Sequence, residues 1–240
     1  MNSRLLSTGF MIAVALVFAA CNRQASNESE GVELDPTKDL PARFKTQEPV
    51  AKPDFSEAAK SAAFQQAIKD AAALLGAEPR PLSSAGEGGE IKGGVGFDVP
   101  EKKLEKILRQ AHTDFLARGF YLFRTDQHFG IQGKPDKVGL LPTADKYAVM
   151  AAMETNGDNY SIGTAGVIAW LKELEPEQPF IMTGIGFDYM EGFFTTPVKD
   201  PKALAKRMYQ FCPDIVDQGT GSVNALADEL RKGALYFWWD

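Results

Sequence analysis

Cys212 is the residue in the second half of the sequence that could act as a thiol nucleophile. A reactive thiolate needs a neighbour that lowers its pKa, and the sequence has only two histidines for this purpose, His112 and His128. However, Cys212 follows Phe211 at the end of an apolar helical pattern and precedes Pro213, a position where a small buried residue is ordinary. The sequence therefore favours a packing role for Cys212, and it favours packing or surface roles for both histidines.

Two carboxylates and an amide follow this thiol, namely Asp214, Asp217 and Gln218. Together with backbone N–H groups at the start of the next helix, they could hold a cation or a polar ligand. Asp side chains also cap helices, and the glycines at 219 and 221 permit a tight turn. The pattern favours a structural turn, and it leaves Asp214, Asp217 and Gln218 as candidate ligand residues.

Trp238, Trp239 and Asp240 form the best candidate surface for a ligand or partner. Adjacent residues of a strand point to opposite faces of the sheet, so at most one of the two tryptophans can enter the core. The other must cover a helix, line a groove or face a partner.

The sequence predicts no metal ion and no cofactor. Residues 155–160 lack the alternating acidic ligands and the distal Glu of a calcium loop, and are interpreted as a capped turn. The glycines within 184–187 lie in a predicted hairpin and do not precede a helix, as a dinucleotide-binding loop requires. Two cysteines and two histidines are too few for a dense metal site or a disulfide scaffold.

Helices and strands that would position these residues have clear signals in the second half of the sequence. Apolar residues at helical spacing and capping residues predict helices that start near 56, 104, 143, 164, 201 and 223. Alternating and apolar runs predict strands over 95–99, 120–124, 180–185, 189–195 and 234–239. Hairpins rather than strict alternation predict an α+β fold, a mainly antiparallel sheet with helices packed on one face.

Residues 1–20 have the pattern of a signal peptide. Arg4 precedes an apolar stretch from Gly9 to Ala20. As a helix this stretch would rise about 18 Å, short of the roughly 30 Å of hydrocarbon that a spanning helix crosses. The segment is therefore predicted to direct export rather than to span the bilayer.

The segment Val17–Cys21 resembles the lipobox of bacterial lipoproteins, in which the cysteine receives a diacylglyceryl group. An ordinary signal peptidase site after Ala19 is the alternative. Lipidation of Cys21 is favoured because an unmodified product would expose this thiol, with only Cys212 as a disulfide partner. The sequence thus predicts acyl chains that hold the protein on a membrane of the cell envelope. Asn22 resembles the residue found in outer-membrane lipoproteins, if the source has two membranes.

Three regions follow the signal peptide. Residues 21–54 are predicted to be a flexible tether, because they combine prolines and charges with few large apolar residues. Residues 55–139 hold predicted helices and strands without an assigned role, and residues 140–240 form the predicted α+β domain. The net charge of −6 offers no basic footprint for nucleic acid, which is therefore not an expected partner.

Several motifs in residues 140–240 resemble one bacterial family. They are the run from Cys212 to Gly219, the segments 155–160 and 168–171, and Trp238-Trp239-Asp240. Together they resemble the family catalogued as domain of unknown function 4253. This family has no established activity or catalytic residues, so the resemblance implies a domain boundary and no mechanism.

These observations favour a non-enzymatic binding or interaction module of unknown ligand, anchored to the membrane through an N-terminal lipid and with a protein as a candidate partner. The alternative is a hydrolase-like enzyme that uses Cys212 or the Asp214/Asp217 pair. The alternative is disfavoured because no base with an orienting neighbour is evident. A buried Cys212 would support binding, whereas a Cys212 beside a histidine in an open cleft would support the enzyme.

Overall fold

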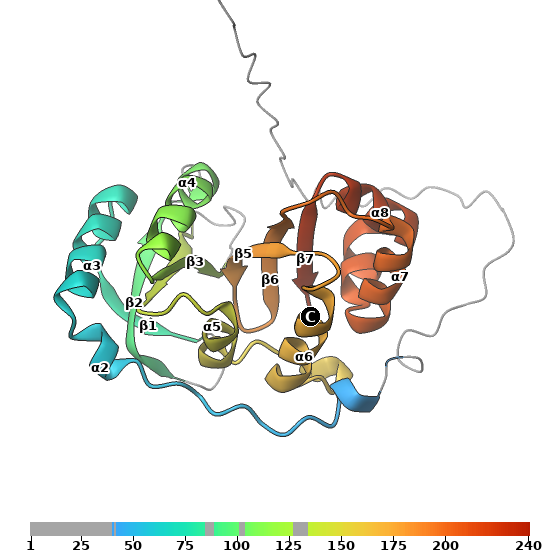
Figure 1. Ribbon diagram of the computed structural model, residues 1–240, viewed down its shortest axis with the longest axis horizontal. Helices are drawn as coiled ribbons and strands as arrows, with labels where there is room; N and C mark the ends of the chain where they lie inside the picture. The colour runs from blue at the N-terminus through green and yellow to red at the C-terminus, as the bar shows by residue number, and fades with distance from the viewer. Residues whose placement is uncertain (1–39, 41, 85–88, 101–103, 127–133) are drawn as a thin grey trace, which may run out of the picture. The chain divides into compact units, whose positions relative to one another are not determined.

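Helices and strands of a single sheet make up most of the computed structural model (Figure 1), which describes residues 40, 42–84, 89–100, 104–126 and 134–240. The strands are β1 (Arg80–Ser83), β2 (Glu90–Val99), β3 (Tyr121–Asp126), β4 (Asp136–Leu141), β5 (Phe180–Ile185), β6 (Tyr189–Phe194) and β7 (Ala234–Trp238). The α-helices are α2 (Ser56–Ala59), α3 (Ala62–Leu75), α4 (Leu104–Ala117), α5 (Lys146–Met153), α6 (Thr164–Leu174), α7 (Pro201–Phe211) and α8 (Val223–Arg231). Short 3₁₀ turns lie at η1 (Ala42–Phe44) and η4 (Asp158–Tyr160), and η5 (Ile215–Thr220) is a π-helix.

The seven strands form one mainly antiparallel sheet in the order β1-β2-β4-β3-β5-β6-β7. β3 and β5 are the exception, because they run parallel and share a single register pair, Arg124 with Gly184. The predicted α+β class with a mainly antiparallel sheet is therefore confirmed. The predicted hairpin of β5 and β6 is also present, with Ile185 opposite Met190.

β4 crosses the domain boundary that the sequence predicted near residue 139. Its backbone pairs with β2 on one side and with β3 on the other, as in the pairs Phe97–Val138 and Phe123–Gly139. Strands from both sides of the predicted boundary therefore share one hydrogen-bonded sheet. The described residues belong to one compact unit, so the two sides of residue 139 do not pack as separate units.

β3 separates two hydrophobic clusters, because neighbouring residues of a strand point to opposite faces. Tyr121 and Phe123 belong to one cluster, and Leu122 belongs to the other. Helices α3 and α4 bury their apolar sides in the Leu122 cluster, and α5 to α8 contribute to the Phe123 cluster. Helices thus cover both faces of the sheet at β3. This corrects the prediction of helices on one face, since α3 and α4 are amphipathic and occupy the face that α5 and α6 leave open.

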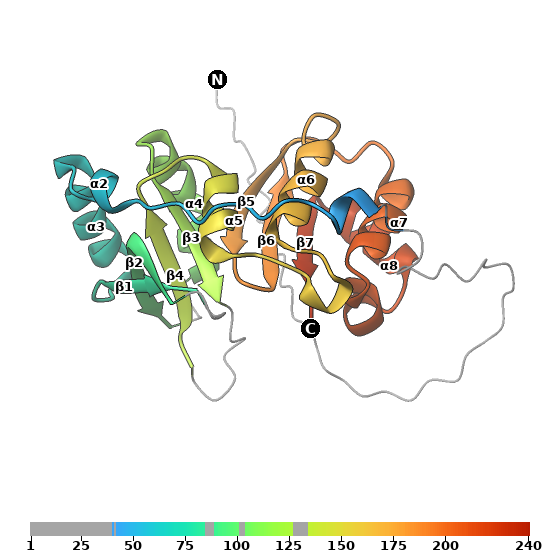
Figure 2. The ribbon, with the colours of Figure 1, turned by 90° about the horizontal axis from the view of Figure 1, so that it is seen from below.

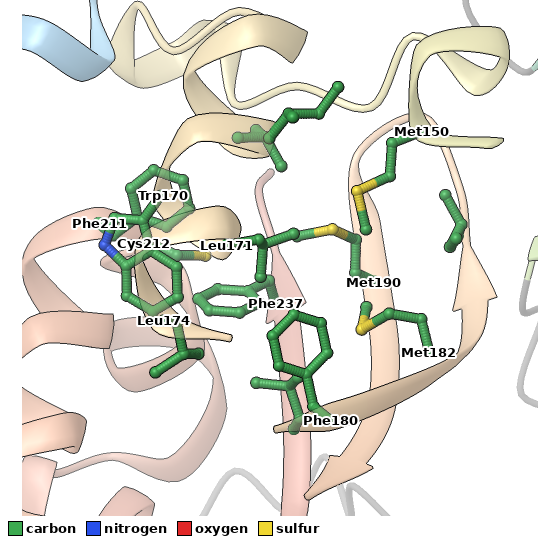
Figure 3. Packing of buried hydrophobic residues seen from close by; sticks show 14 of the residues in the cluster. Met150, Trp170, Leu171, Leu174, Phe180, Met182, Met190, Phe211, Cys212 and Phe237 are labelled. Carbon is green, nitrogen blue, oxygen red and sulfur yellow. The ribbon is translucent and has the colours of Figure 1, made fainter. Parts of the chain in front are cut away.

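Aromatic rings fill the centre of the larger cluster (Figure 3). Phe211 of α7 stacks on Trp170 of α6 with a centroid distance of 4.8 Å, and it meets the ring of Phe237 edge-on at 5.7 Å. Met182 and Met190 lie on the other side of Phe237, where their flexible side chains fill space between β5, β6 and the helices. This packing holds α7 and β7 together, and so positions the residues that follow each of them.

The segment from Ala42 to Asp54 packs along the folded unit instead of forming a free tether (Figure 2). Phe44 is only 3% exposed and belongs to the larger cluster. Arg43 makes two hydrogen bonds to Glu173 of α6, and Lys52 pairs with Glu154 after α5 at 3.0 Å. The predicted tether over 21–54 is therefore wrong for this part, because Phe44 is buried in the core and Arg43 and Lys52 pair with the folded unit. The rest of the predicted tether, the signal peptide and Cys21 lie outside the described residues.

Candidate functional site

Cys212 lies at the end of α7, where its side chain is fully buried in the larger cluster (Figure 3). Its thiol donates a hydrogen bond to the backbone oxygen of Trp238, with Sγ and O 3.0 Å apart. Burial raises the pKa of the thiol well above its ordinary value. The predicted buried position is confirmed, and a thiolate nucleophile is not favoured here.

His112 is held far from this thiol. Its Nδ1 donates to the backbone oxygen of Leu122 in β3 at 2.8 Å, whereas Cys212 bonds to β7. β5 and β6 lie between these two strands, so their backbones are roughly 14 Å apart at the usual strand spacing. The structure therefore does not bring His112 and Cys212 together, and His128 lies outside the described residues.

Asp214 connects three segments that are distant in the sequence. Its Oδ1 accepts hydrogen bonds from the hydroxyl of Tyr160 at 2.7 Å and from the amide of Gln218 at 3.1 Å. Its Oδ2 accepts from the backbone N–H of Asp240 at 3.0 Å. The residue is 4% exposed, so its carboxylate is largely enclosed by these donors. Burial, followed by the hydrogen bond to Asp214, raises the pKa of Tyr160 above its ordinary value.

Asp217 and Gln218 are exposed on the π-helix that follows Asp214. The Asp217 carboxylate accepts from the hydroxyl of Tyr209 on α7 at 3.0 Å, and the Gln218 amide donates to Asp214. Of the predicted ligand residues, Gln218 joins Asp214 in one cluster, and Asp217 faces α7 instead. The arrangement resembles a structural clasp more than an open ligand site.

Trp238 and Trp239 point to opposite sides, as strand geometry requires. Trp239 is 2% exposed, and its ring stacks parallel to Phe237 at 5.8 Å and meets Phe211 edge-on. Trp238 is half-buried and lies opposite Tyr189 of β6. The backbone of Asp240 makes two hydrogen bonds: its N–H donates to the carboxylate of Asp214, and its oxygen accepts from the side-chain amide of Asn159. Trp238 is therefore the one of these three residues whose aromatic ring remains partly open to a partner.

A buried ionic cluster links β3, β4 and β6, and the sequence did not predict it. Arg124 of β3 donates to both carboxylate oxygens of Glu191 in β6 at 2.8 and 2.9 Å. Its Nε lies 3.5 Å from the carboxylate of Asp136, a residue that is fully buried in β4. The cluster links strands on both sides of the β3–β5 junction. The only available signal was Arg124 within a predicted strand, because β4 itself was not predicted.

Two further properties concern the described residues as a whole. Among them, no set of three or more His, Cys, Asp and Glu side chains is arranged to hold a metal ion. Within the same part of the chain, no helix has the length and hydropathy needed to cross a bilayer.

Comparison with protein families finds a match for the second half of the chain. Residues 137–240 match the family described as Domain of unknown function (DUF4253). The predicted resemblance is confirmed for this part, which includes Asp214, Cys212 and Trp238 and excludes His112 and Arg124. The match begins within β4, a strand whose neighbours β2 and β3 lie outside it. No curated protein and no solved structure matches the chain.

Proposed function

We propose that the protein is a lipoprotein of the bacterial cell envelope, anchored through Cys21, and that its folded unit binds a protein partner without catalysing a reaction. The binding role is supported by one observation: the thiol and the carboxylate that an enzyme could use for catalysis are both engaged in contacts within the fold. The Cys212 thiol is buried and bonded to Trp238, and the Asp214 carboxylate accepts three hydrogen bonds within the protein. These contacts give the thiol and the carboxylate a structural role in this proposal.

The aromatic side chains of β6 and β7 supply the partner surface in this proposal. Ala234, Tyr236 and Trp238 alternate with buried residues of β7, and they share a face with Phe193 and Glu191 of β6. Phe193 and Trp238 are half-buried and belong to neither core cluster. Tryptophan is enriched at protein interfaces because its ring buries a large apolar area. We therefore assign the contact with the partner to the face around Trp238.

The anchor rests on the sequence pattern from Val17 to Cys21, and a substitution tests it. We expect Cys21→Ser to shift the protein from the membrane fraction to the soluble fraction, or to leave it unprocessed, because no acyl chain can attach. Fractionation and intact mass measurement of the N-terminus check this result. Cys212→Ala is the matched control and should stay in the membrane fraction with its acyl mass. A wild-type protein without acyl mass would contradict the anchor.

The partner surface has its own test in the same membranes. A photo-reactive aromatic residue in place of Trp238 should form a discrete covalent adduct with another protein, because the ring is partly open. The same residue in place of Leu74, which is 44% exposed on α3, is the control and should give no such adduct. Gel shift and mass spectrometry identify the adducts. Equal labelling from both positions, or none from position 238, would contradict the proposed surface.

A further inference from the structure

A cavity lies where β3 and β5 part from each other. The two parallel strands share one register pair, and near their starts the hydroxyl of Tyr121 donates to the backbone oxygen of Met182 at 2.9 Å. The cavity has a volume of about 300 Å³. Its lining includes His112 and Leu116 of α4, Tyr121 of β3, Phe180 of β5 and Glu175 at the end of α6. A space of this size can hold a molecule with one aromatic ring and a substituent.

His112 gives this cavity a defined hydrogen-bonding requirement. Its Nδ1 lies 2.8 Å from the backbone oxygen of Leu122, and because a carbonyl oxygen only accepts, Nδ1 must carry the proton. Nε2 then holds a lone pair in the neutral ring. Within the described part of the chain, this buried Nε2 has no hydrogen-bond partner.

The neutral ring persists at physiological pH. Burial lowers the pKa of His112 below its ordinary value of 6.5, and the hydrogen bond to Leu122 only partly opposes this shift. The residue is 2% exposed, and its ring meets that of Tyr121 edge-on at 4.9 Å. A buried acceptor without a partner costs free energy, so a donor that reaches it would gain more than an ordinary surface contact.

The rest of the lining is apolar or already paired. Leu116, Phe180 and Met182 offer apolar surface. The carboxylate of Glu175 accepts from the hydroxyl of Tyr147 at 2.6 Å and pairs with Lys146. These two contacts use the hydrogen-bonding groups of Glu175, Tyr147 and Lys146 within the lining. Asp145 and Lys146 also line the cavity, and the ammonium of Lys146 is paired with Glu175. A carboxylate ligand would bring no donor to the lone pair of His112 and would lie near two carboxylates, whereas a neutral or cationic donor would not be repelled by them.

We propose that this cavity binds a small, mainly apolar molecule that carries a hydroxyl or amine group, and that this group donates a hydrogen bond to Nε2 of His112. Nε2 is covered by protein atoms, so the ligand must shift a lining side chain to reach it. Leu116 is only partly buried and can adopt another rotamer for this purpose. None of these residues belongs to the partner surface around Trp238, so the two proposals can fail independently.

Nitrogen NMR of the full chain tests this site directly. With ¹⁵N-labelled histidine the protein gives signals from His112 and His128 alone. Benzyl alcohol and benzylamine are the donor probes, and benzoate is the matched probe without a donor. We expect the donor probes to shift the Nε2 resonance of His112 in a saturable way, without the same change at His128. Benzoate should leave the His112 signal in place. No saturable shift with either donor probe, or an equal shift with benzoate, would overturn the proposal.

His112→Asn separates the acceptor from the structural role of the ring. The Asn side-chain amide can still donate to the backbone oxygen of Leu122, but it has no group in the place of Nε2. Loss of one hydrogen bond to a buried acceptor predicts about tenfold weaker binding of benzyl alcohol, measured by ligand-observed NMR. His128→Asn is the matched control and should bind as wild type does. Equal affinity of His112→Asn and wild type would contradict the role of Nε2, and the resonance shift decides the question if His112→Asn fails to fold.

Discussion

Asp214→Ala should lower the free energy of unfolding by about 3 to 4 kcal/mol, because hydrogen bonds to a buried carboxylate are strong and their donors would be left unpaired. Those donors are the Tyr160 hydroxyl, the Gln218 amide and the backbone N–H of Asp240. For a unit of this size the loss corresponds to a melting temperature about 10 °C lower. Urea unfolding and thermal melts measure the effect.

Asp217→Ala is the matched control for this prediction. Asp217 is an exposed carboxylate three residues further on, with one hydrogen bond from Tyr209, so its loss should change stability by no more than about 0.5 kcal/mol. Asp214→Asn should lie between the two, because the amide keeps one acceptor oxygen and places a donor opposite the N–H of Asp240. A similar stability for Asp214→Ala and Asp217→Ala would show that Asp214 is not a structural centre, and would return it to the candidate ligand residues.

The parts of the fold that were predicted correctly have local causes. Asp200 and Ser222 cap α7 and α8, since their side chains accept from the N–H groups of Ala203 and Ala225 at 3.0 and 3.1 Å. Ser61 was not predicted as a capping residue, and the break in the helix at this position was not predicted either. Its side chain accepts from the backbone N–H of Phe64, and it divides the helix that was predicted to start near residue 56 into α2 and α3. Short-range patterns identify an element well and fix its ends less well.

Two strands were missed because their residues break the usual strand pattern. β1 contains Pro81, which a sheet accepts here because β1 lies at its edge. β4 begins with Asp136 and Lys137 and contains Gly139. A Cβ at Gly139 would lie 2.8 Å from the ring of Phe123, so the glycine allows this ring to pack against the strand. That requirement comes from a partner strand and is invisible in the local sequence.

The candidate site shows the same limit at longer range. Asp214 was identified from its type and its place in a turn, but its partner Tyr160 lies 54 residues earlier. The role of His112 depends on β5 lying beside β3, and the sequence gives no signal for that parallel pair. Residue types therefore pointed to groups capable of chemistry, and only the topology decides which of them are paired. It assigns Asp214 and Cys212 to structure and leaves His112 with an unpaired nitrogen.

Phe44 is the residue whose loss best tests how the chain enters the folded unit. Its ring meets that of Phe211 edge-on, with the ring centroids 6.2 Å apart. The guanidinium carbon of Arg43 lies over the Phe44 ring, 4.6 Å from its centroid. The backbone also approaches α6 closely, since a Cβ at Gly166 would lie 1.9 Å from the backbone oxygen of Phe44. The segment around Phe44 is thus fitted against α6 by both its side chain and its backbone.

Phe44→Ala should therefore lower the free energy of unfolding by about 3 kcal/mol, the lower end of the range for a buried phenylalanine, because a segment near one end of the unit can relax. Gly166→Ala should destabilise the same contact from the other side, since the added methyl group displaces the backbone at Phe44. Val50→Ala, at a position that is 44% exposed in the same segment, is the control and should change stability by less than about 0.5 kcal/mol. Urea unfolding compares the three variants, and limited proteolysis should cut within 45–54 faster in Phe44→Ala than in wild type. If Phe44→Ala and Val50→Ala unfold alike and are cut at the same rate, this segment is the free tether that its composition predicted.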